Sequence, residues 1–471
     1  MFGYAFRMMT GKSPTQKKLK QHFAGRPLEQ IVTAARTFPL ASRVDVQLAV
    51  DEFFAGRQKP ALLGIHSIMG HETSTLAHLF TRSPIPVEIG PLQYDDVDIG
   101  DPTPVRCLRN GLWLAHQGEL PFAVLLSPAM EYGRVGGVHI ELAVPKGEQG
   151  LEFSQEFSQN LEARVNVGGT YRGRVISLEA NHEYSGRGGA VKVHRLRKVA
   201  RDEVVLPERT LVLLDRNVGS FIAARNHIKG LGLSAKKGLL FYGPPGTGKT
   251  HTVHYLASQL PGHTTLLITA EQVGLLGEYF RLARFLQPAL MVVEDVDLIA
   301  RAREQMGSVC EEVLLNKLLN EMDGLREDAD VLVILTTNRP DQLEPALASR
   351  PGRIDQAIEF PLPDEQGRAR LVKLYSRGLE LPAELTEIVV RKTKGASPAF
   401  IKELMRRAAQ FQFEMNGGNG RPALGSAAPA ANLGPLRQNA IDGALEEMLF
   451  SGGTLNLKLL GGSTTELGAR D

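Results

Sequence analysis

Cysteine is almost absent from this 471-residue chain, which contains only Cys107 and Cys310. Two cysteines so far apart in sequence exclude a disulfide scaffold and a zinc site built from thiolates. A low cysteine content is typical of proteins in a reducing compartment. We therefore expect a cytoplasmic protein.

Long apolar runs are also missing. The longest runs, Ala289–Val293 and Val331–Leu335, are far shorter than the roughly 20 residues that a helix needs to span a bilayer. The N-terminal residues include Arg7 and have no continuous apolar core, so they do not have the pattern of a secretory signal. We expect no membrane span.

A strong charge of either sign is lacking, because 54 Lys and Arg residues balance 52 Asp and Glu residues and leave a formal charge of +2. This balance argues against nucleic acid as a partner. Basic residues without acidic ones occur at 1–26, which we interpret as a basic, partly disordered arm. An arm that binds nucleic acid or anionic lipid is the alternative. The basic stretch 192–201 alternates with valine, which predicts one solvated face of a strand.

The composition is otherwise that of a globular protein, and the length predicts two or three domains. Short apolar stretches separated by turn residues predict an α/β or α+β domain over 27–150, with helices at 27–37 and 43–55 and an irregular segment at 94–103. A connector of mixed helix and strand is expected over 151–207. Neither region contains a motif to which chemistry can be assigned.

Three histidines, His66, His71 and His78, lie close together in the sequence. The segment HETST at 71–75 lacks the second histidine of HExxH, and no nearby acidic residue completes a zinc ligand set at a familiar spacing. We interpret them as ordinary surface or core histidines.

The pattern changes at about residue 208, where apolar strands begin to alternate with helices. Strands separated by helices predict a parallel, doubly wound sheet. After residue 362 the pattern is helical only. The expected divisions are a large α/β subdomain at 208–362, a helical lid at 363–413, a Gly/Ala/Pro linker at 414–436, and a terminal helix and tail at 437–471.

The strongest motif is GPPGTGKT, which matches the GxxxxGK[ST] pattern of a phosphate-binding loop and lies between an expected strand and an expected helix. Its glycines let the backbone curl so that several N–H groups point at one anion. We expect Lys249 to bind the β- and γ-phosphates and the Thr250 hydroxyl to bind Mg²⁺. The candidate nucleotide-binding residues are Gly243, Pro244, Pro245, Gly246, Thr247, Gly248, Lys249, Thr250 and His251.

Polar side chains follow the later strands. Glu294 and Asp295 end one apolar strand, at the sheet edge where the phosphate loop is expected. One carboxylate can hold the magnesium shell while the other polarises the attacking water. Asn338 follows the next strand, and its amide can position that water. Arg350 and Arg353 lie on a stiff turn and can stabilise charge on a transferring phosphoryl group.

Together these motifs resemble the AAA branch of the AAA+ ATPases. The resemblance implies an α/β fold with a P-loop, doubly wound parallel sheet and a C-terminal helical lid, preceded by a separate α/β or α+β region. It also implies ATP hydrolysis with Mg²⁺ in a homo-oligomeric ring, usually a hexamer, that does mechanical work on a macromolecule. The residues that carry it are GPPGTGKT (243–250), VVEDVD (292–297), TTNRPDQLEPAL (336–347), RPGRID (350–355) and TKGASPAFIKEL (393–404).

By this resemblance, Asn338 is sensor 1, Arg350 and Arg353 are arginine fingers that reach the ATP of a neighbouring subunit, and Gly395 and Ser397 flank the base and ribose.

The order of the two carboxylates, Glu294 and Asp295, is the reverse of the usual Asp-Glu. Aligning Asp297 with the family's later aspartate places Glu294 at the magnesium position and Asp295 at the position of the base, and the opposite assignment stays open. A similar reversal occurs in the mitochondrial AAA translocase of the Rieske protein.

The segment TAEQVGLLGEYF at 269–280 stands where the family has a loop that grips substrate, but it has no aromatic residue before Val273. We expect Tyr279 and Phe280 to be helix residues that pack inward. Two functions follow: an ATP-driven remodeller or translocase whose N-terminal region recognises a protein client, or a slow ATP-dependent switch or assembly scaffold. A regulatory ATPase that feeds a protease is weaker, since the sequence ends in Gly-Ala-Arg-Asp rather than hydrophobic-Tyr-x.

Overall fold

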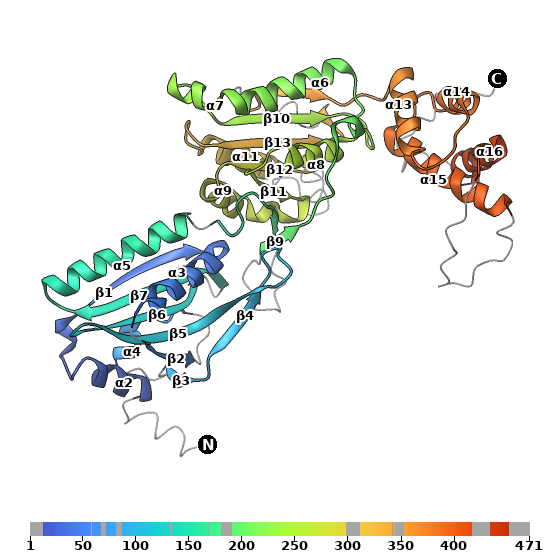
Figure 1. The fold of residues 1–471 in the computed structure, drawn as a ribbon. Coiled ribbons are helices and arrows are strands. Elements are labelled where there is room, and N and C mark those ends of the chain that lie inside the picture. The colour runs from blue at the N-terminus through green and yellow to red at the C-terminus, as the bar shows by residue number, and fades with distance from the viewer. Residues whose placement is uncertain are drawn as a thin grey trace. The chain divides into compact units, whose positions relative to one another are not determined.

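The chain forms two compact units, Met1–Arg195 with Gly277–Gln287, and Leu196–Leu276 with Pro288–Asp471 (Figure 1). Hydrophobic cores are found within each unit. The computed structural model describes residues 13–57, 59–66, 72–81, 87–131, 134–167, 169–179, 191–297, 311–341, 343, 353–416 and 434–451.

The first unit is built on an antiparallel sheet. Its strands are β1 (Ile31–Pro39), β2 (Ala61–His66), β3 (Glu88–Gly90), β4 (Gln93–Val97), β5 (Val105–Gln117), β6 (Leu120–Glu131) and β7 (Arg134–Pro145). They are ordered β1-β7-β6-β5-β2-β3, and β4 pairs with β5. Successive residues of a strand point to opposite faces, and in β6 both sets are apolar, so that Phe122 and Ala123 lie in different cores.

Helices cover both faces of this sheet (Figure 1). On one face, α3 (Arg43–Ala55) and α5 (Glu148–Val167) pack against Phe122 and its neighbours. On the other face, α2 (Pro14–His22) and α4 (Leu76–Phe80) pack against Ala123 and its neighbours. The unit also contains an antiparallel hairpin of β8 (Val175–Leu178) and β9 (Val191–His194).

Several expectations for the N-terminal half are wrong. A helix was expected over 27–37, but residues 31–39 form β1, because all nine residues pair with β7 and this pairing outweighs the helical spacing of apolar residues. Residues 93–97 form β4 within the segment expected to be irregular. Within the expected basic, partly disordered arm at 1–26, residues 14–22 form the ordered helix α2, in which Leu19 is fully buried, and Phe23, just after the helix, is 1% exposed. Residues 1–12 lie outside the described part.

The connector expected over 151–207 is not a separate subdomain. Helix α5 shares the core of α3, and the first unit extends to Arg195. Residues 203–207, at the end of this expected connector, contain the end of a 3₁₀ turn (Arg201–Glu203) followed by extended chain without strand pairing.

The second unit contains five parallel strands, β10 (Lys237–Tyr242), β11 (Thr264–Ile268), β12 (Ala289–Val293), β13 (Val331–Thr337) and β14 (Gln356–Glu359), in the order β14-β10-β13-β12-β11. This arrangement confirms the predicted doubly wound P-loop sheet. Because β13 lies between β10 and β12, the segments that follow these three strands meet at one edge. The accompanying helices are α6 (Glu208–Leu214), α7 (Phe221–Gly230), α8 (Lys249–Gln259) and α11 (Glu311–Asp323). Helix α9 (Leu276–Phe285) belongs, apart from its first residue, to the first unit.

The lid is a helical cluster with its own core. It consists of α13 (Glu365–Tyr375), α14 (Ala383–Lys392), α15 (Pro398–Met415) and α16 (Gln438–Glu446). The expected terminal helix is therefore part of the lid, because Ile441 and Leu445 of α16 are buried against α15. Residues 417–433 of the linker and 452–471 of the tail lie outside the described part. Over the described ranges, no helix combines the length and apolarity needed to cross a bilayer.

We predict that Leu19→Ala destabilises the first unit by about 2–5 kcal/mol, because it removes a fully buried side chain and leaves a cavity. Trp113, the only tryptophan, is buried in this unit, so its fluorescence during urea unfolding reports the unit's stability. Lys17→Ala on the exposed side of α2 is the control. Equal unfolding midpoints for Leu19→Ala and the unmodified chain would mean that α2 does not contribute to the core.

Candidate nucleotide-binding site

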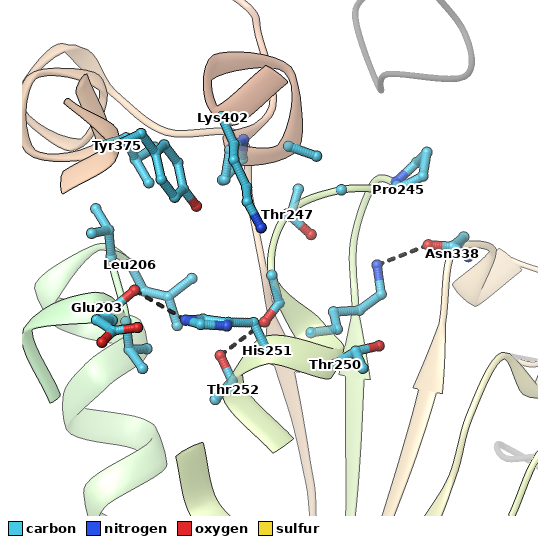
Figure 2. A pocket seen from close by; sticks show the side chains of 18 of the residues that line it. Glu203, Leu206, Pro245, Thr247, Thr250, His251, Thr252, Asn338, Tyr375 and Lys402 are labelled. Carbon is cyan, nitrogen blue, oxygen red and sulfur yellow. Dashed lines mark hydrogen bonds between the residues drawn. The ribbon is translucent and has the colours of Figure 1, made fainter. Parts of the chain in front are cut away.

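The loop between β10 and α8 borders a cavity of about 430 Å³ (Figure 2), a volume within the usual range for small-molecule sites. Buried β10 ends at Tyr242 and α8 begins at Lys249, so the first turn of the helix opens on the cavity and can bind an anion. Gly246 has φ +76°, and a Cβ there would lie 2.9 Å from both Ser397 Oγ and Ala399 Cβ of the lid segment. Glycine therefore permits this close approach.

Lys249 is 6% exposed and is held by three oxygen atoms. Its Nζ donates to the carbonyl oxygens of Gly243 at 2.8 Å and Pro244 at 3.0 Å, and to Asn338 Oδ1 at 2.8 Å. Burial lowers the pKa of Lys249 to about 8, although the nearby carboxylate of Asp295 acts in the opposite direction. The ammonium group is thus partnered but not neutralised by direct contact with an acid, and phosphate oxygens can stabilise its charge.

Asp295 lies at the same edge, directly after β12. Its Oδ1 accepts a hydrogen bond from Asn338 Nδ2 at 3.1 Å, and its backbone N–H donates to Thr336 Oγ1 at 3.0 Å. Its φ of +47° is in the left-handed region, where a residue other than glycine is strained. Burial, together with the negative charge of Asp297, raises the pKa of Asp295. The backbone hydrogen bond to Thr336 and the side-chain hydrogen bond from Asn338 hold Asp295 in this strained backbone conformation.

Asp297 holds the backbone of Asn338 in place. It is 3% exposed, and its Oδ1 accepts from Thr337 Oγ1 at 2.8 Å and from the backbone N–H of Asn338 at 3.1 Å. A buried carboxylate that accepts from a hydroxyl and a backbone N–H at the end of the next strand has a structural role. It sets the direction in which the Asn338 side chain leaves β13.

Glu294 and Thr250 supply oxygen atoms suited to Mg²⁺. Glu294 Oε1 is buried and has no hydrogen-bond partner within the described residues. The exposed Thr250 lines the cavity on the first turn of α8. Carboxylate and hydroxyl oxygens are the ligands that Mg²⁺ takes, often through water. An unsatisfied buried carboxylate oxygen is costly, so the chemistry of Glu294 suits a cation or a water molecule as its partner. Thr250 lines the cavity, whereas Glu294 is not among its lining residues.

Arg353 does not line this cavity. Its carbonyl lies against Gly238 near the start of β10, whereas the phosphate loop follows the end of that strand. Gly238 lies five residues before Gly243, the first residue of the loop, and five residues at roughly 3.3 Å each span about 17 Å. The Arg353 side chain forms an ion pair with Asp323 at the end of α11. Arg350 lies outside the described residues.

The lid contributes one wall of the cavity, but through residues other than those expected. Gly395 has φ +75° and shapes the turn before α15, and Ser397 Oγ caps this helix by accepting from Phe400 N at 3.1 Å. Neither residue lines the cavity. Its lining from the lid consists of Leu371, Tyr375, Pro398, Ala399 and Lys402 (Figure 2).

The segment 203–206 forms another wall that the sequence analysis missed. His251, which was expected to bind nucleotide, lines the cavity and contacts Glu203 O through Nε2 at 3.3 Å; burial lowers the pKa of His251. Lys402 lies four residues after Pro398 on the same helical face, but neither residue was an expected site residue. Nothing in the sequence distinguishes Tyr375 from other lid residues.

Metal-binding clusters of three or more His, Cys, Asp or Glu residues are not found in the described ranges. His66 Nε2 contacts the backbone oxygen of Pro91 at 3.0 Å. His71 and Cys310 lie outside these ranges, and Cys107 is a buried free thiol.

A known protein family matches part of the second unit. The model of the AAA family, described as "ATPase family associated with various cellular activities", matches residues 239–362. This confirms the family resemblance of the nucleotide module.

Similar proteins include the 26S proteasome regulatory subunit S10B homolog B of Arabidopsis thaliana, which is 34% identical over 193 residues, 38% of this chain and 48% of that protein. The probable 26S proteasome regulatory subunit 10B of Caenorhabditis elegans is 33% identical over 244 residues, 49% of this chain and 55% of that protein. The proteasome-activating nucleotidase of Thermococcus kodakarensis is 37% identical over 192 residues, 38% and 48% respectively. The chain thus spans about half the length of the curated relatives it matches.

The lowered pKa of Lys249 predicts proton uptake when a phosphate ligand binds. At pH 8 about half of the Lys249 side chains are neutral, and the negative phosphates raise their pKa, so ADP binding should take up about half a proton per site. The affinity for ADP should therefore fall as the pH rises above 8. Calorimetry in two buffers of different ionisation enthalpy measures this uptake, with Lys249→Arg as a control that stays charged. Absence of uptake by the unmodified chain at pH 8 would show that Lys249 is already fully charged.

Proposed function

We propose that this chain is an AAA-type ATPase that binds ATP with Mg²⁺ and hydrolyses it. The observation that carries the proposal is the hydrogen-bonded series Lys249–Asn338–Asp295, which joins the segments following β10, β13 and β12 beside one cavity. It brings together a cation for phosphate, an amide that can position water and a carboxylate that can accept a proton. The AAA match at 239–362 supports the same activity.

Each residue of the site has a separate role in binding or hydrolysing ATP. Lys249 and the loop N–H groups bind the phosphates, while Thr250 and Glu294 hold the magnesium shell. Asp295 accepts the proton of the attacking water, which Asn338 positions; the raised pKa of Asp295 makes its carboxylate a better proton acceptor. When bound, Mg²⁺ neutralises charge that develops on the phosphates.

Hydrolysis is completed in a homo-oligomeric ring, of hexameric size by family resemblance. The backbone of Arg353 lies at the opposite end of β10 from its own phosphate loop, about 17 Å away by strand length, so its guanidinium is suited to a neighbour's nucleotide. We assign Arg350 and Arg353 to this role in trans. The relatives whose names describe proteasome subunits and activators are consistent with an assembly of this kind.

The work done by the ring is the remodelling or translocation of a protein client that the N-terminal unit recognises. One observation favours the alternative, a slow switch or assembly scaffold without threading. Val273 is 2% exposed, and Tyr279 and Phe280 are fully buried, so the described segment 269–280 presents no exposed aromatic side chain for gripping a chain. Some relatives are named proteasome-activating nucleotidases, and activation of a proteasome is a second alternative for the work of the ring.

The ATPase rate per mole of chain, measured over a wide range of protein concentration, tests this function. Asp295→Asn is the blank, since it keeps the shape of the site but cannot accept a proton. We expect a specific rate that rises with concentration and then saturates, because each site is completed by a neighbour. No rate above the blank at any concentration, with ATP bound, would refute the ATPase and favour the switch.

We predict that Arg350→Ala lowers the rate of ATP turnover by at least about 100-fold, because an arginine finger stabilises the transition state. The affinity for ATP should change by less than about threefold. Arg326→Ala, which removes an exposed arginine paired only with Asp328 in the described structure, is the matched control. Mixing Arg350→Ala chains with Lys249→Ala chains should restore activity, since mixed rings pair an intact loop with an intact finger. Failure of the mixture to recover activity, with mixed rings verified by sizing, would place the arginine's action within its own subunit.

A further inference from the structure

We infer that the first unit binds an acidic peptide segment in a basic cavity formed by α2, the start of β2 and the end of β5. This inference rests on the proposed function, in which the N-terminal unit recognises a protein client, and it adds the chemistry by which the client is recognised. The occupant is a stretch of client chain that carries aspartate or glutamate side chains.

The cavity has a volume of about 400 Å³, which is within the range of ligand-binding pockets. Alanine and leucine side chains of β2 and β5 form its apolar part. None of the described residues that line it is acidic. Its polar lining consists of Lys18, Gln21, His22, Lys59 and His116. A cavity with this lining is suited to an anionic ligand.

Two lysines from different elements supply the positive charge. Lys18 lies on α2 one helical turn before His22, so both side chains share one face of the helix. Lys59 lies two residues before β2 begins. Both lysines are exposed, and within the described residues neither ammonium group forms an ion pair with a carboxylate. Residues 1–26 contain no acidic residue, so α2 itself cannot neutralise this charge.

The two histidines form a fixed part of the wall. His22 Nε2 donates to the carbonyl oxygen of Phe122 at 3.0 Å, and the ring of His116 meets that of His22 edge-on, with centroids 4.7 Å apart. Burial lowers the pKa of His22, and the neighbouring His116 acts in the same direction. His22 is therefore mostly neutral at pH 7, and the charge that attracts a ligand is that of Lys18 and Lys59.

Two other anionic partners, lipid and nucleic acid, fit this site less well. A helix that lies on a lipid surface has an apolar face free for the bilayer, whereas Leu19 of α2 and the adjacent Phe23 are buried in the core of the unit. Nucleic acid is bound through many phosphate contacts along its length, whereas this charge is gathered in one cavity of a chain with a formal charge of only +2. A short acidic peptide matches the two lysines better.

The test is the fluorescence anisotropy of two labelled peptides titrated with the full chain. Aspartate and glutamate alternate with glycine in one peptide, and asparagine and glutamine replace the acids in the other. The amide peptide should bind at least about tenfold more weakly than the acidic one, because only carboxylates pair with ammonium groups.

Variants of the cavity show whether the acidic peptide binds there. Lys18→Gln and Lys59→Gln should each weaken its binding about two- to fivefold, as expected for an exposed ion pair, and the double variant should weaken it about tenfold. Lys17→Gln is the matched control, because it removes the same charge from the exposed side of α2 outside the cavity. This variant should bind the acidic peptide as the unmodified chain does.

The outcomes separate this inference from the function on which it rests. Equal weakening by Lys17→Gln and Lys18→Gln overturns the inference, since the peptide then responds to the general charge of α2. It is also overturned if a single-stranded oligonucleotide or phosphatidylserine vesicles bind through Lys18 and Lys59 while the acidic peptide does not.

The ATPase rate of the same preparation completes the test. Lack of acidic-peptide binding by a chain that hydrolyses ATP overturns the inference and leaves the proposed ATPase intact. Binding that depends on Lys18 and Lys59, in a chain that hydrolyses no ATP, supports the peptide site and refutes the proposed ATPase.

Discussion

The site depends on the side-chain amide of Asn338, which bridges the buried ammonium group of Lys249 and the partly buried carboxylate of Asp295. Its oxygen accepts from Lys249 Nζ at 2.8 Å, and its nitrogen donates to Asp295 Oδ1 at 3.1 Å. A lysine and a carboxylate taken out of water each cost free energy unless they are partnered. A neutral amide satisfies both at once and keeps them from forming a direct ion pair, so both charges stay available to a ligand.

This bridge requires a particular sheet. Because β13 lies between β10 and β12, the residue after β13 can reach the loop after β10 and the acid after β12. Asp297 then fixes the direction of Asn338 through its backbone N–H. The Glu-Asp order is accommodated by the left-handed conformation of Asp295, while Glu294 keeps a buried oxygen without a partner in the described structure. The two acids therefore occupy different environments although they are adjacent in sequence.

The parts of the structure that could be predicted are those whose signal is local. The fully buried strands β12 and β13 are continuous apolar runs, and the phosphate loop is a contiguous motif, so both were found. Strand β1 was mistaken for a helix, since its conformation is set by pairing with β7, more than a hundred residues later. Lys402 and Tyr375 were missed for the same reason: only the folded lid brings them to the loop. Arg353 lies at the end of β10 opposite the phosphate loop, and this location could be seen only from the direction of the folded strand, not from the motif that contains Arg353.

The measurement that tests the central claim most directly compares Glu294→Gln with Asp295→Asn, by titrating Mn²⁺ into each variant with ATP bound and following its electron paramagnetic resonance signal. If Glu294 holds the metal shell and Asp295 acts on water, Glu294→Gln should weaken Mn²⁺ binding by about tenfold or more, whereas Asp295→Asn should bind Mn²⁺ normally and retain unhydrolysed ATP. Weakened Mn²⁺ binding in Asp295→Asn, with normal binding in Glu294→Gln, would contradict the account and exchange the two roles.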